Sequence, residues 1–115
     1  MTQEEILQYN KRCAEFLGMD NDAFLLAKQI EKNTGICHLK FHSDWNWIME
    51  VVEAIEHKTI EGYPYRFETK NGYVWFLNEL ADKDSIIIQT EINSSLKEAV
   101  VEAINQFLIW YNENN

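Results

Sequence analysis

The chain has 115 residues, 46% of them hydrophobic, with four Trp, five Tyr, six Phe and a single Pro. This length and composition fit one globular domain spanning residues 1–115, and they exclude a disordered chain. The formal net charge is −9, with thirteen acidic and five basic residues in the segment 43–115 against six and five in 1–42. An acidic field repels phosphate backbones and attracts basic surfaces, so direct nucleic-acid binding is disfavoured and docking onto a basic protein is favoured.

The N-terminus and the cysteines bear on the cellular compartment. Glu4 and Glu5 stand where a secretory signal needs positive charge, and no apolar stretch approaches the roughly 20 residues that span a bilayer. Cys13 and Cys37 lie well apart in sequence, which suits a reducing compartment better than a disulfide framework. We therefore expect a cytoplasmic protein without a membrane partner.

A first helix is predicted from about Gln3 to Leu17. Thr2 and Glu5 form a capping-box pattern, and Gly18 supplies a left-handed cap at the end. Apolar residues recur between them at helical spacing: Ile6, Tyr9, Cys13, Phe16 and Leu17. The segment 19–42 is less decided, because 21–27 could begin a short helix and 36–41 could add a short strand to a sheet.

A second helix is predicted after Ser43, which we take as its N-cap. The core stripe of this helix is expected to consist of Trp45, Ile48, Val52 and Ile55. Trp47 lies two residues after Trp45, about 200° round the helix, so it is expected against the preceding loop or partly in solvent.

Three glutamates of the second helix, Glu50, Glu53 and Glu56, recur at three-residue intervals, and no basic residue follows them before Lys58. We call these three side chains the acidic row. They are expected on an exposed face, either as an ordinary solvated surface or as a docking surface for Lys and Arg of a partner.

A hairpin and a third strand are predicted next. Asn71-Gly72 separates two segments in which every second residue is apolar or aromatic, as in a β-strand with one buried face. This dipeptide is the strongest short signal for a type I′ turn. The hairpin side chains expected in the core are Tyr65, Phe67, Trp75 and Leu77. The unbroken run Ile86-Ile87-Ile88 predicts a strand buried on both faces, at the centre or the protected side of the sheet.

A last helix should start after Ser95, where Ser95 and Glu98 repeat the capping-box pattern. Its core stripe comprises Leu96, Val100, Ala103, Ile104, Phe107 and Tyr111. Trp110 lies off this stripe, so for Trp47 and Trp110 two roles stay open, internal packing or an interface hot spot. The fold class is therefore α+β, in the order α-α-β-β-β-α, with an antiparallel sheet of three to four strands packed on one face against helices.

Catalytic and metal motifs are weak. A partial metal cluster is suggested by Cys37, His38 and His42. The segment is predicted to be strand or loop, however, and no second pair of metal ligands is evident elsewhere in the sequence. His42-Ser43-Asp44 contains the residue types of a hydrolase triad, but neighbours in sequence point in divergent directions. We expect no enzyme activity, no metal and no cofactor.

Two blocks carry a resemblance to a known group of proteins. LKFHSDWNWIMEVVEAIE (residues 39–56) and AVVEAINQFLIWYN (residues 99–112) resemble a family of small phage and prophage proteins from Bacteroidetes. Those proteins share a His-loop-Trp-x-Trp helix, a central sheet and a final helix ending in Trp-Tyr-Asn. The family has no established activity, so no functional residue is carried over.

The resemblance implies a phage context, and short acidic phage proteins include inhibitors of host defence such as anti-CRISPR proteins. The first hypothesis is therefore an acidic inhibitor in the bacterial cytoplasm that docks on a CRISPR effector, an RNA-guided RNA-cleaving nuclease. The acidic row, Trp47 and Trp110 are its candidate contacts. The alternatives are a homo-oligomeric phage accessory protein and a small metal-dependent enzyme built around Cys37, His38 and His42.

Overall fold

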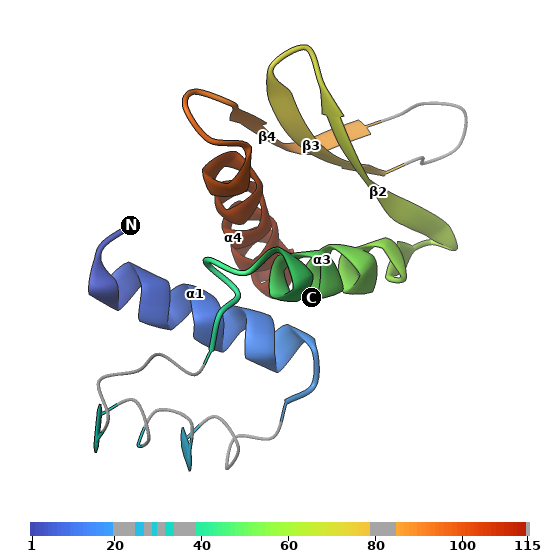
Figure 1. The fold of residues 1–115 in the computed structure, drawn as a ribbon. Coiled ribbons are helices and arrows are strands. Elements are labelled where there is room, and N and C mark those ends of the chain that lie inside the picture. Colours follow the sequence, from blue (N-terminus) through green and yellow to red (C-terminus); the bar gives the residue numbers. More distant parts are fainter. Residues whose placement is uncertain (20–24, 27–28, 30–31, 34–38, 79–84, 115) are drawn as a thin grey trace.

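The computed structural model describes residues 1–19, 25–26, 29, 32–33, 39–78 and 85–114. Its elements are α1 (Gln3–Phe16), α3 (Trp45–Glu56), β1 (Thr59–Ile60), β2 (Tyr63–Lys70), β3 (Tyr73–Asn78), β4 (Ser85–Glu91) and α4 (Leu96–Asn114). The α+β class is confirmed, with the order α-α-β-β-β-β-α and an antiparallel sheet packed against helices (Figure 1). The helix considered at 21–27 falls mostly outside the described residues.

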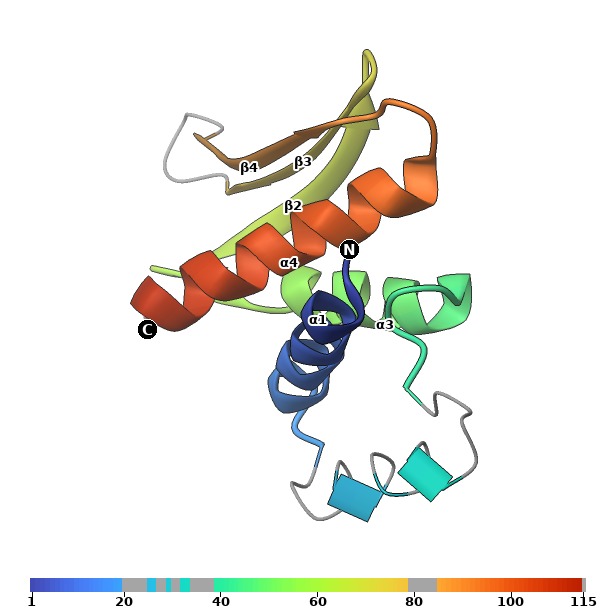
Figure 2. The same ribbon diagram turned by 90° about the vertical axis from the view of Figure 1, so that its left-hand side faces the viewer.

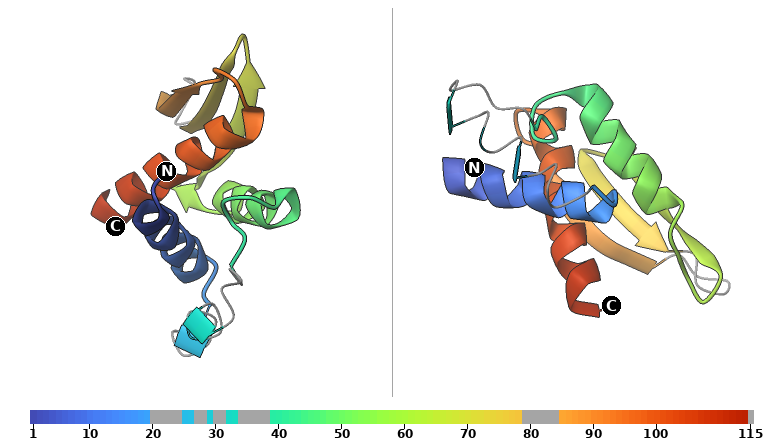
Figure 3. Two further views of the ribbon diagram at one scale, coloured as in Figure 1. Left: turned by 60° about the vertical axis from the view of Figure 1, so that its left-hand side comes forward. Right: turned by 90° about the horizontal axis from the view of Figure 1, so that it is seen from below.

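The elements form layers. α3 and α4 pack against one face of the sheet, and α1 packs against α4 from the other side (Figures 2 and 3). No described helix covers the opposite face of the sheet (Figure 2). α3 and α4 therefore lie between the sheet and α1.

The sheet has four strands in the order β1-β2-β3-β4. Its fourth strand is β1, which pairs with the start of β2, and not the segment 36–41. Of that segment, 36–38 lie outside the described residues, and Phe41 sits in a turn whose backbone is bound by α1 side chains. The expected strand is wrong for 39–41, because side chains rather than a neighbouring strand satisfy this backbone.

The hairpin turn is confirmed. Lys70 pairs with Tyr73, so the loop has two residues, and Asn71 and Gly72 have φ of 54° and 82°. Both values are positive, as a type I′ turn requires.

Replacing Gly72 by Val should lower the free energy of unfolding by about 1–3 kcal/mol, because a β-branched residue at this φ is strained. Apart from Gly72 itself and its two neighbours in sequence, no heavy atom lies within 4 Å of the position that a Cβ would take, so the cost comes from the backbone and not from a clash. Gly72→Asn is the matched control, since Asn tolerates positive φ and should lose much less. Equal melting temperatures for Gly72→Val and the native protein would contradict this turn.

The core face of the hairpin differs from the expectation in β3. Because the two-residue loop pairs odd positions of β2 with even positions of β3, Phe67 lies opposite Phe76 and Thr69 opposite Val74. Val74 and Phe76 therefore face the helices, and Trp75 faces the other side, where its indole donates to Gln89 Oε1 at 2.9 Å. Placing Trp75 in the core with Tyr65 and Phe67 was wrong. Leu77 is also buried, but it points to the opposite face of the sheet from Phe76, the same face as Trp75.

β4 is an edge strand and not a central one. Phe76 pairs with Ile88 and Leu77 with Ile86, so Ile87 is an extra residue in a β-bulge. Ile88 is 8% exposed on the core face, whereas Ile86 is 51% exposed. The prediction of burial on both faces was wrong, because Ile86 pairs with Leu77 on the face that no described helix covers.

The helix caps follow the sequence signals with one correction. Thr2 Oγ1 accepts a hydrogen bond from the Glu5 amide, and Ser95 Oγ accepts one from the Glu98 amide. The N-cap of α3 is Asp44, whose carboxylate accepts a hydrogen bond from the backbone N–H of Asn46 at 2.8 Å. Ser43 therefore lies one residue before the cap.

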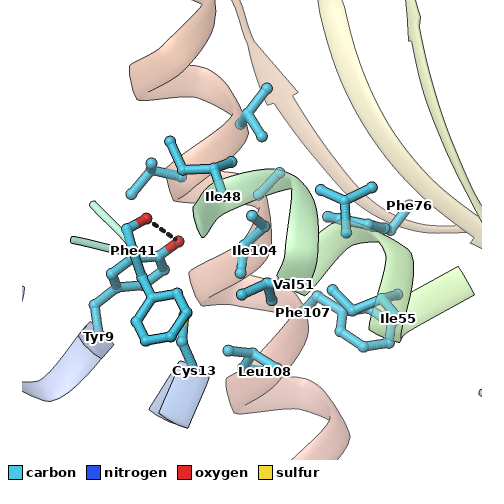
Figure 4. Close-up of a cluster of buried hydrophobic side chains, with 14 of the residues drawn as sticks. Tyr9, Cys13, Phe41, Ile48, Val51, Ile55, Phe76, Ile104, Phe107 and Leu108 are labelled. Atoms are coloured by element: carbon cyan, nitrogen blue, oxygen red, sulfur yellow. Dashed lines mark hydrogen bonds between the residues drawn. The ribbon is translucent and has the colours of Figure 1, made fainter. Parts of the chain in front are cut away.

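The core joins α1, α3 and α4 to the sheet (Figure 4). At its α1 end, the Tyr9 hydroxyl donates to the carbonyl oxygen of Phe41 at 3.0 Å, and Cys13 is fully buried beside it. Burial raises the pKa of the Cys13 thiol to about 12, so the thiolate is scarce at neutral pH. Cys13 is a packing residue and not a nucleophile.

Candidate protein-interaction surface

The acidic row lies on the exposed side of α3, as the spacing predicts. Ile48, Val51, Val52 and Ile55 turn inward and are fully buried, which leaves the glutamates on the opposite side of the helix. Among the described residues one salt bridge forms, between Arg66 and Glu68 at 2.6 Å, and it lies in β2. The carboxylates of the acidic row therefore have no cationic partner within the described ranges.

Two members of the acidic row occupy an unfavourable place in the helix. Glu53 and Glu56 are in the last turn of α3, which holds no basic residue. The C-terminal end of a helix carries the negative end of its dipole, so these carboxylates destabilise α3. Glutamates three residues apart also repel one another. The acidic row therefore costs the free protein some stability.

Glu56→Lys should raise the free energy of unfolding by about 0.3–1 kcal/mol, since a cation suits this end of the helix. Glu4→Lys is the matched control, because Glu4 is in the first turn of α1 and its reversal should destabilise. Denaturant unfolding at low salt would measure both. A loss of stability with Glu56→Lys would remove the dipole argument.

The two tryptophans considered as contacts are both partly buried. Trp47 packs edge-on against Phe41, with ring centroids 4.8 Å apart, which confirms that it contacts the preceding loop. The ring centroid of Trp110 lies 5.8 Å from that of Phe107 and 6.2 Å from that of Tyr65. Their role in binding a partner stays a prediction.

Trp45, by contrast, is 38% exposed, and assigning it to the core stripe was wrong. The buried stripe of α3 includes Val51, which moves its centre away from Trp45. Met49, one turn further on, is 40% exposed. Both residues belong to the outer side of α3, and the i, i+3, i+7, i+10 spacing of the predicted stripe could not reveal this.

The residues of the metal and triad hypotheses do not form a site in the described part of the chain. Cys37 and His38 lie outside it. His42 Nδ1 is 3.0 Å from the side-chain nitrogen Nδ2 of Asn10. Asp44 is used as a helix cap. No group of three His, Cys, Asp or Glu side chains within the described ranges is placed to hold a metal ion.

A cavity of about 370 Å³ lies where the start of α1, the turn at His42 and the first turns of α4 meet. It is lined by Met1, Ile6, His42, Glu98, Val101 and Glu102. Glu98 and Glu102 are exposed and stand one helical turn apart. Exposed acidic side chains therefore lie on α4 as well as on α3.

Comparison of the chain with models of protein families, with curated proteins and with solved structures finds no match. Within the described ranges, no helix is both long and apolar enough to cross a membrane.

Proposed function

We propose that this chain is a non-catalytic acidic binding protein that docks on a basic surface of another protein through α3. The observation that carries the proposal is the acidic row, three exposed carboxylates on one helix that form no ion pair with any described residue. These charges cost the free protein stability, and a basic partner would offset that cost.

The most concrete partner is the RNA-guided RNA-cleaving nuclease suggested by the resemblance to phage and prophage proteins. Such a nuclease holds RNA in a positively charged channel, and carboxylates on the exposed side of α3 would compete there with RNA phosphates. In this proposal the chain is a phage-encoded anti-CRISPR inhibitor, and inhibition weakens as the concentration of competing RNA rises.

The test is cleavage of a fluorescent RNA by the purified nuclease, with and without the protein. Reversal of the acidic row to lysine should abolish inhibition and slow association by on the order of ten- to a hundredfold at low salt, since steering charges act on the association rate. The matched control carries the same charge change elsewhere, with Glu4, Glu15 and Glu113 reversed to lysine, all three exposed. The control should keep most of the inhibition.

Equal inhibition by the two triple variants would show that the acidic row is not the docking surface. No inhibition by the native protein at any RNA concentration would reject the nuclease as partner. Raising the salt concentration should weaken binding of the native protein more than that of the acidic-row variant, because screening acts on exposed charge pairs.

A further inference from the structure

The outer side of α3 combines apolar and acidic side chains in one stripe. Trp45, Met49, Glu53 and Glu56 are all exposed. With about 100° per residue, these positions fall within a band about 80° wide along the helix. We call this band the outer stripe. Its N-terminal half is apolar and its C-terminal half is acidic.

The ring of Trp45 already accepts a cation. Lys97 of α4 places its Nζ 5.8 Å from the centroid of the Trp45 ring. This is the geometry of a cation–π interaction, and 38% of the Trp45 residue stays exposed. Trp is enriched among interface hot spots, and the exposed part of Trp45 is open to burial by a partner.

The two halves of the outer stripe are separated by a fixed distance. The midpoint of Trp45 and Met49 lies about 11 Å along the helix axis from the midpoint of Glu53 and Glu56, at 1.5 Å per residue. A complementary ligand therefore needs an apolar pair and a basic pair about two helical turns apart. A helix carrying both pairs on one face meets this requirement.

We infer that the outer stripe binds a basic amphipathic helix of a partner protein, with apolar side chains on Trp45 and Met49 and Arg or Lys side chains against Glu53 and Glu56. The inference rests on the proposed docking of α3 on a basic protein, and it names the element that docks. A second copy of the chain fits poorly, because two molecules of net charge −9 repel each other.

The probe is a synthetic 18-residue Ala-rich helix carrying two Leu four residues apart and, two turns later, two Arg four residues apart. A control peptide of the same composition distributes these residues around the helix. Fluorescence anisotropy should show the patterned peptide binding about tenfold or more tighter than the control peptide, and Trp45→Ala should weaken its binding about tenfold through faster dissociation. Ile109→Ala, an exposed apolar residue on α4, should bind like the native protein.

Equal affinity for the two peptides, or unchanged binding by Trp45→Ala, would overturn the inference. A dimer in sedimentation that Trp45→Ala dissolves would overturn it too, because a second copy would then occupy the stripe. The peptide experiment needs no nuclease, so its failure is separate from failure of the proposed function. Nuclease inhibition that depends on the acidic row but not on Trp45 would reject only the amphipathic helix.

Discussion

Phe107→Ala should lower the free energy of unfolding by about 3–5 kcal/mol, the usual loss for a fully buried aromatic residue. Phe107 has no exposed surface, and it joins α4 to the sheet. Its ring centroid lies 5.2 Å from those of Tyr65 and Phe76, and 5.8 Å from those of Trp110 and Tyr111. The cavity left by alanine would remove contacts with both β2 and β3 at once.

Denaturant unfolding with two controls would measure the effect. Phe107→Leu keeps most of the apolar volume and should lose clearly less than alanine. Ile109→Ala, two residues away and 36% exposed, should change stability by less than about 0.5–1 kcal/mol. A loss below about 1.5 kcal/mol for Phe107→Ala would mean that the helix layer does not depend on this ring.

Asn10→Ala should lower the free energy of unfolding by about 1–3 kcal/mol, because it leaves a buried backbone donor without its acceptor. Asn10 is 2% exposed, and its Oδ1 accepts a hydrogen bond from the Phe41 amide at 3.1 Å. Its Nδ2 lies 3.0 Å from His42 Nδ1. Together with the Tyr9 bond to the Phe41 carbonyl oxygen, Asn10 fixes the turn before α3 to α1.

Amide hydrogen exchange at Phe41 adds a local readout to global unfolding. The Phe41 amide should lose protection in Asn10→Ala, whereas the amides of β3 should change only as far as global stability falls. Asn112→Ala is the control, since Asn112 is exposed near the end of α4 and should be near neutral. Native protection at Phe41 in Asn10→Ala would show that this hydrogen bond does not hold the turn.

Features that depend on neighbours in sequence were predictable from the chain alone. The bounds of α1 follow from Thr2 and Gly18, and the type I′ turn follows from Asn71-Gly72, because caps and tight turns are satisfied within a few residues. The exposure of the acidic row follows from helical periodicity, since charged side chains avoid the core.

Features that depend on distant segments were decided by the tertiary structure. The sequence does not show that β4 lies at an edge or that Ile87 forms a bulge, because both depend on how β4 pairs with β3. The buried amide of Asn10 gives no local signal, since its acceptor role is set by Phe41, which is 31 residues away. Trp45 matched the core spacing of α3, yet the packing of the helix buries Val51 and leaves Trp45 beside Lys97. Periodicity fixes which residues share a helix face, but only packing against the other elements decides which of the apolar residues at its margin stay exposed.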